Sequence, residues 1–346
     1  MKTLNIAIVG FGFMGRTHYG AWKKIPGAKV VAICDVNLKQ LTNKVKGNGK
    51  DADMTTDFTG VAIHDDFDAL LAAGGLDVVD LTLPTPLHPP LVAKALAAGC
   101  HVLCEKPMAL DAKACGAMIA AAAKAKGKLM IAQCLRFAPP TKYIHDLVVS
   151  KKYGEVVSAS FDRMSMAPGW GGKKSWFLDE KVSGGMILDM HIHDADFINW
   201  TLGRPKSVTV RRHVRGDGIT DRTVSLYDYG NRVVTSATSW AAAPSFVFEA
   251  RFHIEFEKAT LIMDSKRAEP LQVYPFKGKQ FCPKLDYGLS AYEAEIKAFA
   301  DWVRGRRPSL PLTLEDARDA VALVDAERRS MVTGRTVVLP PLKRRG

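Results

Sequence analysis

Short apolar runs and amphipathic stretches alternate over the first 134 residues. Five apolar runs predict strands, at residues 4–9, 29–34, 77–83, 101–104 and 128–133. The stretches between them predict helices, over residues 16–24, 38–46, 66–73, 89–98 and 111–126. Strands that alternate with helices pair in parallel, because each helix carries the chain back to the same end of the sheet. We therefore expect residues 1–134 to form an α/β domain with a doubly wound parallel sheet.

The pattern changes after Cys134. The pair Pro139-Pro140 breaks the alternation, and a helix is predicted over residues 141–150. Later runs predict strands of an antiparallel sheet, at residues 156–164, 207–214, 223–229, 232–239 and 246–256. Two closing helices are predicted over residues 292–304 and 314–333. We assign residues 135–346 to a second domain, whose last helices are candidates to pack back on the first.

A glycine motif follows the first predicted strand. It opens a predicted helix, and Asp35 ends the next strand, twenty residues beyond the last glycine. This order of strand, turn, helix and acid is the dinucleotide-binding fingerprint. Gly10 allows the tight turn, Gly12 lets backbone N–H groups approach a pyrophosphate, and Gly15 lets helix and strand pack closely. The whole turn is expected to hold the cofactor, namely Gly10, Phe11, Gly12, Phe13, Met14 and Gly15.

Asp35 bears on which cofactor is bound. A carboxylate placed to bind the ribose hydroxyls repels a 2′-phosphate, which favours NAD over NADP. Arg16, just after the glycine turn, points the other way, because its guanidinium could reach a phosphate. We expect NAD, with NADP as the lesser alternative.

Two further strand ends carry candidate residues, since ligands of an open parallel sheet lie at the carboxyl ends of its strands. Pro84 and Thr85 follow one strand and His88 comes soon after, so all three are candidates to contact the cofactor. Glu105 and Lys106 follow the next strand and are expected beside the same ligand. Pro107 then fixes the turn, and a peptide bond before proline can be cis.

Residues 183–196 read SGGMILDMHIHDAD. As one helix, this segment puts Asp189, His193 and Asp196 on one face, at i, i+4 and i+7. A carboxylate one turn from an imidazole orients the ring and stabilises its protonated form. Asp189 and His193 are therefore a candidate acid–base pair. The alternative is a buried polar pair that only stiffens the helix.

Composition narrows the class of protein. Of the 346 residues 47% are apolar and 24% charged, as in an ordinary soluble globular protein of two domains. No run approaches the roughly 18 apolar residues of a membrane span. The six cysteines show no disulfide framework and no CxxC pair, which favours a reducing cytoplasm. The formal charge of +12 is spread along the chain without a nucleic-acid-binding motif, so we expect no nucleic-acid partner.

The glycine turn, the Glu105-Lys106-Pro107 motif and the SGGMILDMHIH segment together resemble the Gfo/Idh/MocA family, which includes glucose-fructose oxidoreductase and inositol dehydrogenase. The similarity covers nearly the whole chain. It implies a Rossmann domain followed by an α/β domain with a large, mostly antiparallel open sheet that makes homodimers or homotetramers. It also implies oxidation of a sugar or polyol hydroxyl, or the reverse reduction, with NAD or NADP.

The resemblance also assigns roles to residues. The catalytic lysine of the family maps to Lys106, and its Asp-x-x-x-His motif maps to Asp189 and His193. His193 would be the general base, Asp189 would orient it, and Lys106 would hydrogen-bond the reacting oxygen or share the proton transfer. His191 lies off this face and receives no catalytic role.

Substrate identity is where the sequence says least. Besides the three catalytic candidates, Arg136, Arg163 and Trp176 are expected to bind substrate, and Trp170, Lys173 and Lys174 lie in similar segments. Tryptophan can stack on a sugar ring, and basic side chains can bind a carboxylate or phosphate. An acidic or nucleotide-linked sugar is therefore a hypothesis.

Three rival interpretations remain. A metal site in the 189–196 segment is disfavoured, because its ligand-type residues scatter around the helix and no cysteine or glutamate completes a set. Some relatives oxidise a glycoside transiently with bound NAD and then cleave it. Other relatives bind a nucleotide and act as regulators without turnover, although this chain retains Lys106, Asp189 and His193.

Overall fold

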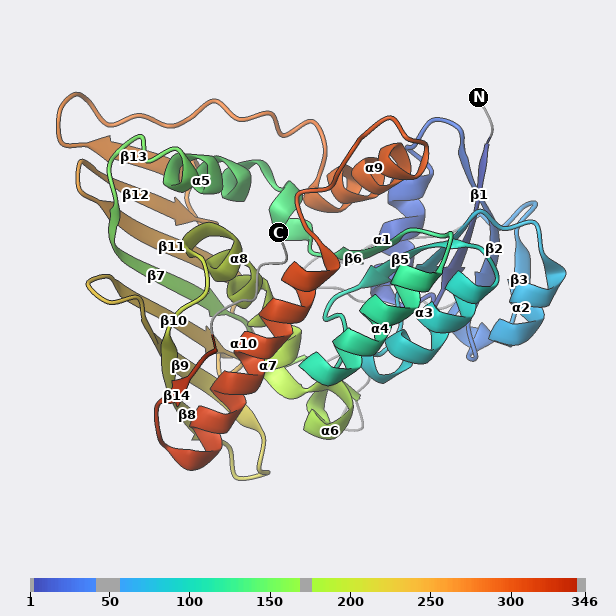
Figure 1. Ribbon diagram of the computed structural model, residues 1–346, viewed down its shortest axis with the longest axis horizontal. Coiled ribbons are helices and arrows are strands. Elements are labelled where there is room, and N and C mark those ends of the chain that lie inside the picture. Colours follow the sequence, from blue (N-terminus) through green and yellow to red (C-terminus); the bar gives the residue numbers. More distant parts are fainter. Residues whose placement is uncertain (1–2, 42–56, 169–175, 341–346) are drawn as a thin grey trace. The chain divides into compact units, whose positions relative to one another are not determined.

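The chain divides into two compact units. A computed structural model describes residues 3–41, 57–168 and 176–340 (Figure 1). The first unit comprises residues 1–137 and 288–318, and the second comprises residues 138–287 and 319–346. The chain therefore leaves the first unit after Phe137 and returns to it between Gly288 and Arg318.

The first unit contains a parallel sheet of six strands in the order β3-β2-β1-β4-β5-β6. The strands are β1 (Leu4–Val9), β2 (Ala28–Cys34), β3 (Ala62–His64), β4 (Val78–Leu81), β5 (His101–Glu105) and β6 (Leu129–Ala132). All four residues of β4 are buried, as in a strand covered on both faces. The strand order reverses at β1, which pairs with both β2 and β4. The doubly wound sheet predicted from the sequence is confirmed, and its switch point lies beside the glycine turn.

Among the described residues, five α-helices accompany this sheet: α1 (Phe13–Trp22), α2 (Phe67–Ala73), α3 (His88–Ala97), α4 (Ala112–Lys124) and α9 (Ala291–Val303). Helix α9 packs against α1, where the rings of Trp22 and Phe299 meet edge to face at 6.4 Å (Figure 1). A capping box between Ser290 and Glu293 begins α9. Of the helix predicted over residues 38–46, the structure shows a 3-10 helix at Leu38–Leu41, and the remainder lies outside the described residues.

The second unit is built on an eight-stranded sheet with the order β13-β12-β11-β7-β10-β9-β8-β14. Its strands are β7 (Val156–Met164), β8 (Ser207–Val214), β9 (Thr220–Asp228), β10 (Val233–Ser239), β11 (Glu249–Phe256), β12 (Ala259–Asp264), β13 (Leu271–Pro275) and β14 (Val337–Val338). Of the strand pairs described in this sheet, β7 with β10 is the one parallel pair. The mostly antiparallel sheet is confirmed, and β12, β13 and β14 extend it beyond the strands predicted.

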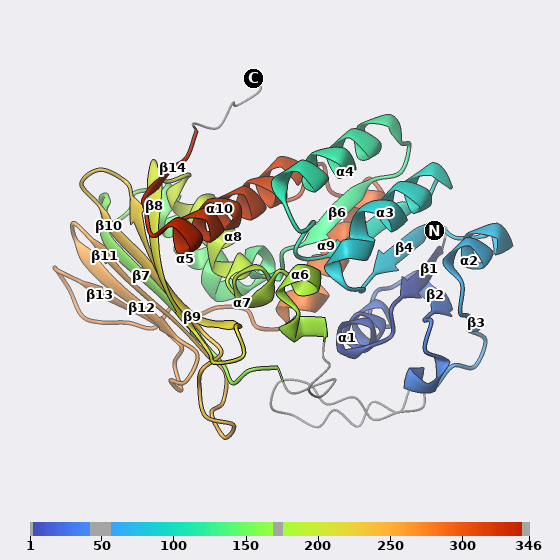
Figure 2. The same ribbon diagram turned by 90° about the horizontal axis from the view of Figure 1, so that it is seen from below.

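The described helices of the second unit are α5 (Pro139–Val149), α6 (Glu180–Ser183), α7 (Gly185–Asp189), α8 (Ile192–Leu202) and α10 (Leu314–Thr333). Helix α10 begins in the first unit and belongs to the second from Asp319 onward. Helices α5, α8 and α10 lie along one face of the sheet (Figure 2). Buried and exposed residues alternate along β9 and β11, so the other face is open. The rings of Phe161, Phe197 and Phe252 form the core between sheet and α8, with centroids 5.1–5.9 Å apart.

Two further expectations concern the whole chain. All six cysteines are free, and five of them are buried. Among the helices that the structure describes, none combines the length and the apolar character that crossing a membrane requires.

Candidate active site

The turn between β1 and α1 depends on glycine at two positions. Gly10 has φ +88°, and a Cβ there would lie 2.7 Å from the carbonyl oxygen of Thr82. A Cβ on Gly15 would lie 2.1 Å from the carbonyl oxygen of Gly10. A Cβ on Gly12 would meet no described atom within 4 Å, and no side-chain hydrogen bond caps α1 at this residue. The start of α1 thus has no side-chain cap among the described residues and leaves room beside Gly12, which fits the pyrophosphate of a dinucleotide.

Asp35 follows β2 and is tied to this turn. Its Oδ2 accepts the backbone N–H of Phe11 at 2.7 Å, and its Oδ1 accepts that of Asn37 at 2.8 Å. Each carboxylate oxygen keeps a second lone pair, so Asp35 can still accept hydrogen bonds from ribose hydroxyls. Arg16 lies over the Phe11 ring, with Cζ 5.1 Å from the centroid, and its Nη2 donates to the carbonyl of Leu41 at 3.1 Å.

Thr85 and His88 are both buried after β4, at 3% and 1% exposure. The ring nitrogens of His88 lie 2.9 Å from two backbone oxygens, those of Pro107 and Leu83. Burial lowers the pKa of His88, so the neutral ring donates to one of the two carbonyls at a time. His88 therefore joins the loops that follow β4 and β5. Its contact with the cofactor, like those of Pro84 and Thr85, stays a prediction.

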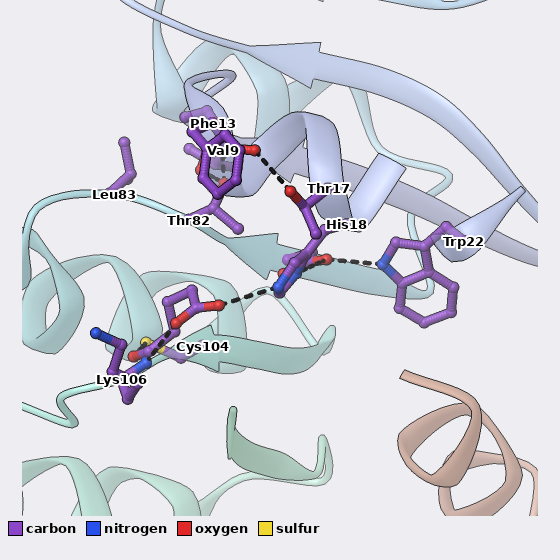
Figure 3. A network of polar contacts seen from close by, with 12 residues as sticks. Val9, Phe13, Thr17, His18, Trp22, Thr82, Leu83, Cys104 and Lys106 are labelled. Carbon is purple, nitrogen blue, oxygen red and sulfur yellow. Dashed lines mark hydrogen bonds and ion pairs between the residues drawn. The ribbon is translucent and has the colours of Figure 1, made fainter. Parts of the chain in front are cut away.

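The Glu105-Lys106-Pro107 turn presents one side chain to the outside. The peptide bond between Lys106 and Pro107 is cis, as the sequence suggested. From Val102 to Ala109 every residue is buried except Lys106. In Figure 3 the Lys106 side chain extends away from His18. The turn thus buries its neighbours and leaves Lys106 partly exposed.

A buried polar network, which was not predicted from the sequence, includes Glu105, the residue before this lysine. His18 bonds to Asp80 and Glu105, and the indole N–H of Trp22 donates to Asp80 at 2.7 Å (Figure 3). The sequence did carry one signal for it. Asp80 interrupts the apolar run Val78–Leu81, and a charge inside a buried strand needs a partner.

In the second unit, two consecutive glycines begin the Asp189–His193 segment. Gly184 and Gly185 have φ +79° and +71°, a conformation that other residues rarely adopt. A Cβ on Gly184 would also lie 2.4 Å from Nη2 of Arg328. Ser183 stabilises the turn, because its Oγ accepts the N–H of Gly185 at 2.8 Å.

The segment then forms two helices, so the prediction of one continuous helix is wrong. Helix α7 ends at Asp189, and α8 begins at Ile192. Asp196, which was expected on the same face, is buried in α8 at 1% exposure.

Burial nevertheless singles out two residues of this segment. From Ser183 to Ile198 every residue is buried except Asp189 and His193. They lie at the end of α7 and in the first turn of α8, on either side of the break. The two predicted catalytic residues of the second unit are therefore the polar side chains of this segment that solvent or a ligand can reach.

The neighbouring polar residues anchor the segment to the interior. His191 Nδ1 lies 3.0 Å from the hydroxyl of Thr238, and Nε2 lies 3.1 Å from Glu327. Asp194 accepts two hydrogen bonds from Arg163, at 2.7 and 2.8 Å. His191 thus points into the unit, in keeping with its exclusion from the catalytic face.

The other predicted substrate contacts have partners within their own units. Arg163 is 5% exposed and forms the bidentate pair with Asp194. Arg136 is 2% exposed and donates to the carbonyl of Pro311 at 2.9 Å. Trp176 is partly exposed and stacks on Phe177 at 3.9 Å. Their substrate contacts stay predictions, and Trp170, Lys173 and Lys174 lie outside the described residues.

Comparisons with known proteins agree with this arrangement. Residues 4–133 match the description "Oxidoreductase family, NAD-binding Rossmann fold", and residues 141–262 match "GFO/IDH/MocA C-terminal domain". Inositol 2-dehydrogenase of Rhizobium meliloti (strain 1021) is 26% identical over 351 residues, which cover 97% of this chain and 99% of that protein. D-glucoside 3-dehydrogenase of Escherichia coli (strain K12) is 30% identical over 213 residues, covering 61% of this chain and 57% of that protein.

A solved structure extends the likeness of the fold to both units. Levoglucosan dehydrogenase in complex with NADH and L-sorbose aligns with a TM-score of 0.83 at 18% identity, covering 99% of this chain and all of that one (100%). The two family matches together span more than two thirds of the chain. The chain therefore belongs to the Gfo/Idh/MocA family of oxidoreductases with an NAD-binding Rossmann fold.

Proposed function

We propose that the protein is an NAD-dependent dehydrogenase that oxidises a secondary hydroxyl of a sugar, polyol or sugar derivative, or reduces the corresponding ketone. One observation supports it most directly. In two buried segments, the side chains left accessible are Lys106 in one and Asp189 with His193 in the other. These are the residue types that alcohol oxidation requires, and the first unit also carries the glycine turn of a dinucleotide-binding fold.

The three residues divide the work on the hydroxyl group. His193 accepts the O–H proton, and Asp189 orients the imidazole and stabilises its protonated form. Lys106 donates a hydrogen bond to the oxygen while the carbonyl forms. When bound, NAD supplies the acceptor for the hydride that leaves the carbon. The glycine turn and Asp35 hold the dinucleotide by its pyrophosphate and ribose.

A substrate panel tests this proposal. We expect NADH to accumulate with at least one polyol, neutral sugar or sugar acid, and NAD to outperform NADP. Cleavage of a glycoside without net NADH would favour transient oxidation instead. Tight NAD binding without turnover of any substrate would favour a regulator.

Variants test the assignment of residues. His193→Asn and Lys106→Met should each lower kcat by about 10²–10⁴-fold. The control Lys113→Met lies at an exposed position of α4 and should stay within about twofold of the parent. In the double variant His193→Asn/Lys106→Met the losses should combine to less than their product, because both residues act on one hydroxyl. Fully multiplicative losses would contradict this shared role.

We also propose that the protein forms a homodimer or homotetramer through the open face of the second sheet. Three apolar side chains lie on that face, Val224, Leu226 and Val233, with exposed fractions of 44%, 52% and 60%. An apolar patch in the middle of an uncovered sheet is typical of an interface. Leu226→Asp should lower the mass measured by light scattering, and an unchanged mass would contradict the assembly. The free cysteines support a reducing, cytoplasmic location.

A further inference from the structure

Four ionisable side chains meet behind Lys106 in the interior of the first unit. His18 comes from α1, Asp80 from β4, Glu105 from the end of β5 and Glu295 from α9. None of the four is more than 5% exposed. We call them the His18 cluster. Charges are costly to bury without compensation, so their protonation states must suit one another.

The hydrogen bonds of His18 determine its protonation state. Its Nδ1 lies 2.9 and 3.0 Å from the two oxygens of Asp80, and its Nε2 lies 3.0 Å from Oε1 of Glu105. An ionised carboxylate can only accept, so both ring nitrogens donate and His18 is an imidazolium. Burial lowers the pKa of His18, but the charges of Asp80 and Glu105 and their hydrogen bonds outweigh it and raise the pKa well above its usual value.

Glu295 differs from Asp80 and Glu105 in its protonation state. Both of its carboxyl oxygens are buried, and neither has a hydrogen-bond partner among the described residues. One of them lies within 4.8 Å of both the His18 and the Glu105 atoms. Burial, and then the charges of Glu105 and Asp80, raise the pKa of Glu295 well above its usual value. Glu295 therefore keeps its proton and is neutral.

The cluster thus holds one excess negative charge. The imidazolium offsets one of two carboxylates, Asp80 and Glu105. Cys104 of β5 also faces them, but burial raises the pKa of its thiol well above the usual range, so it is neutral. Burial raises the pKa of Glu105, yet His18 and the charge of Lys106 outweigh that effect and lower it. Glu105 must stabilise the ammonium form of Lys106 in return.

We propose that the His18 cluster is a positioning device for Lys106, which keeps Glu105 ionised and fixed against the Lys106 backbone so that the lysine stays an ammonium group. Oε2 of Glu105 accepts the backbone N–H of Lys106 at 3.0 Å, while His18 holds Oε1. Trp22 fixes Asp80 from the other side (Figure 3). The cluster acts through Lys106 and does not touch substrate. Its catalytic meaning rests on the proposed function, in which Lys106 meets the reacting oxygen.

A metal ion is the competing occupant of the same place. His18, Glu105 and Glu295 offer three ligand atoms within 4.8 Å of one another. A cation would need the lone pair of His18 Nε2, which an imidazolium does not have. Metal analysis of the purified protein separates the two. One equivalent of a divalent ion that survives dialysis against a chelator would overturn the proposal.

Competitive acylation of amines, read by mass spectrometry across neutral and alkaline pH, tests the charge coupling. It gives the pH at which Lys106 becomes nucleophilic, and it needs neither cofactor nor substrate. Glu105→Gln keeps the side-chain shape and removes the charge, so the Lys106 midpoint should fall by about one pH unit or more. Lys113, exposed on α4, is the internal reference and should not move. An unchanged or higher Lys106 midpoint would overturn the proposal.

Two more variants test whether Glu105 or Glu295 carries the negative charge that acts on Lys106. Glu295→Gln replaces a neutral acid by a neutral amide, so the Lys106 midpoint should stay at the parent value. A fall as large as that in Glu105→Gln would place the charge on Glu295 and refute the proposal. Glu105→Asp substitutes for Glu105→Gln if the latter does not fold. Glu105→Asp moves the carboxylate back by the length of one methylene group, so the Lys106 midpoint should fall less than in Glu105→Gln. An unchanged Lys106 midpoint in Glu105→Asp would refute the proposal.

The labelling result is independent of turnover. A lowered midpoint in Glu105→Gln, in a protein that oxidises no substrate, would support the cluster and refute the proposed function. An unchanged Lys106 midpoint in an active dehydrogenase would support the proposed function and refute the role of the cluster. Thermal unfolding and circular dichroism verify that each variant is folded.

Discussion

The carbonyl oxygen of Gly10 lies 2.1 Å from the place that a Cβ on Gly15 would occupy. Gly10 follows β1 directly and Gly15 lies in the first turn of α1, so the start of the helix packs closely against the end of the strand. This close approach brings the first helical N–H groups to the carboxyl edge of the sheet. The effect of a single added methyl group at Gly15 on stability therefore measures how tight this packing is.

We predict that Gly15→Ala lowers the free energy of unfolding by about 1–3 kcal/mol, because the methyl group forces helix and strand apart. NAD binding should weaken as well. Gly20→Ala is the matched control on the same helix, where an added Cβ meets no described atom within 4 Å. It should stabilise the protein by about 0.5–1 kcal/mol, and urea denaturation measures both. Equal stability of the two variants would contradict the close packing.

Asp35 should decide between the two dinucleotides. Asp35→Asn removes the charge that repels a 2′-phosphate while keeping the size of the side chain. We expect the ratio of NADP to NAD affinity, measured by fluorescence titration, to rise by about tenfold, or 1.4 kcal/mol. Asp65→Asn, at an exposed position, should leave the ratio unchanged. Equal affinity of the parent protein for both dinucleotides would refute this role of Asp35.

The pair formed by Arg163 and Asp194 should matter for folding. Both side chains are buried and joined by two hydrogen bonds. Asp194→Asn leaves a buried guanidinium without its counter-charge, and should lower the free energy of unfolding by about 3–5 kcal/mol. The double variant Arg163→Met/Asp194→Leu should lose less than the two single variants combined. Additive losses in denaturation would show that the two residues act separately.

Glu295 gives a prediction with a defined pH dependence. Its folded-state pKa is raised by burial, so the folded protein must bind a proton that the unfolded chain releases above about pH 4.3. The stability that this group contributes is present at lower pH and lost as the pH rises towards the folded pKa. The stability of Glu295→Gln relative to the parent should therefore grow by about 1.4 kcal/mol per pH unit over that window.

Urea denaturation at several pH values measures this slope. Glu315→Gln, at an exposed position of α10, is the control and should show no comparable slope. A flat difference between Glu295→Gln and the parent would mean that Glu295 is ionised in the folded protein.

Local signals predicted much of the first unit. The parallel sheet and the glycine turn depend on neighbouring residues, and Gly10, Gly15 and Asp35 lie where the fingerprint requires. The break at Met190–His191 was missed, because His191 is anchored by Thr238 and Glu327, which are far away in sequence.

Other features were missed because they form only in the folded chain. Strands β12 and β13 are short runs whose pairing depends on neighbours in the sheet. The His18 cluster draws on four elements, and nothing near Glu295 in the sequence indicates that α9 brings it to His18. The partial exposure of Lys106, Asp189 and His193 likewise depends on the burial of their sequence neighbours.

The return of residues 288–318 to the first unit has a consequence during synthesis. When the ribosome has made residue 137, the nucleotide-binding unit still lacks α9, with Phe299 and Glu295. The intervening 150 residues, 138–287, take roughly 8 to 30 s to translate. During that interval α9 has not yet been made and cannot cover Trp22 of α1. The nucleotide-binding unit is therefore the first to begin synthesis, but it can be completed only after residues 138–287 have been translated.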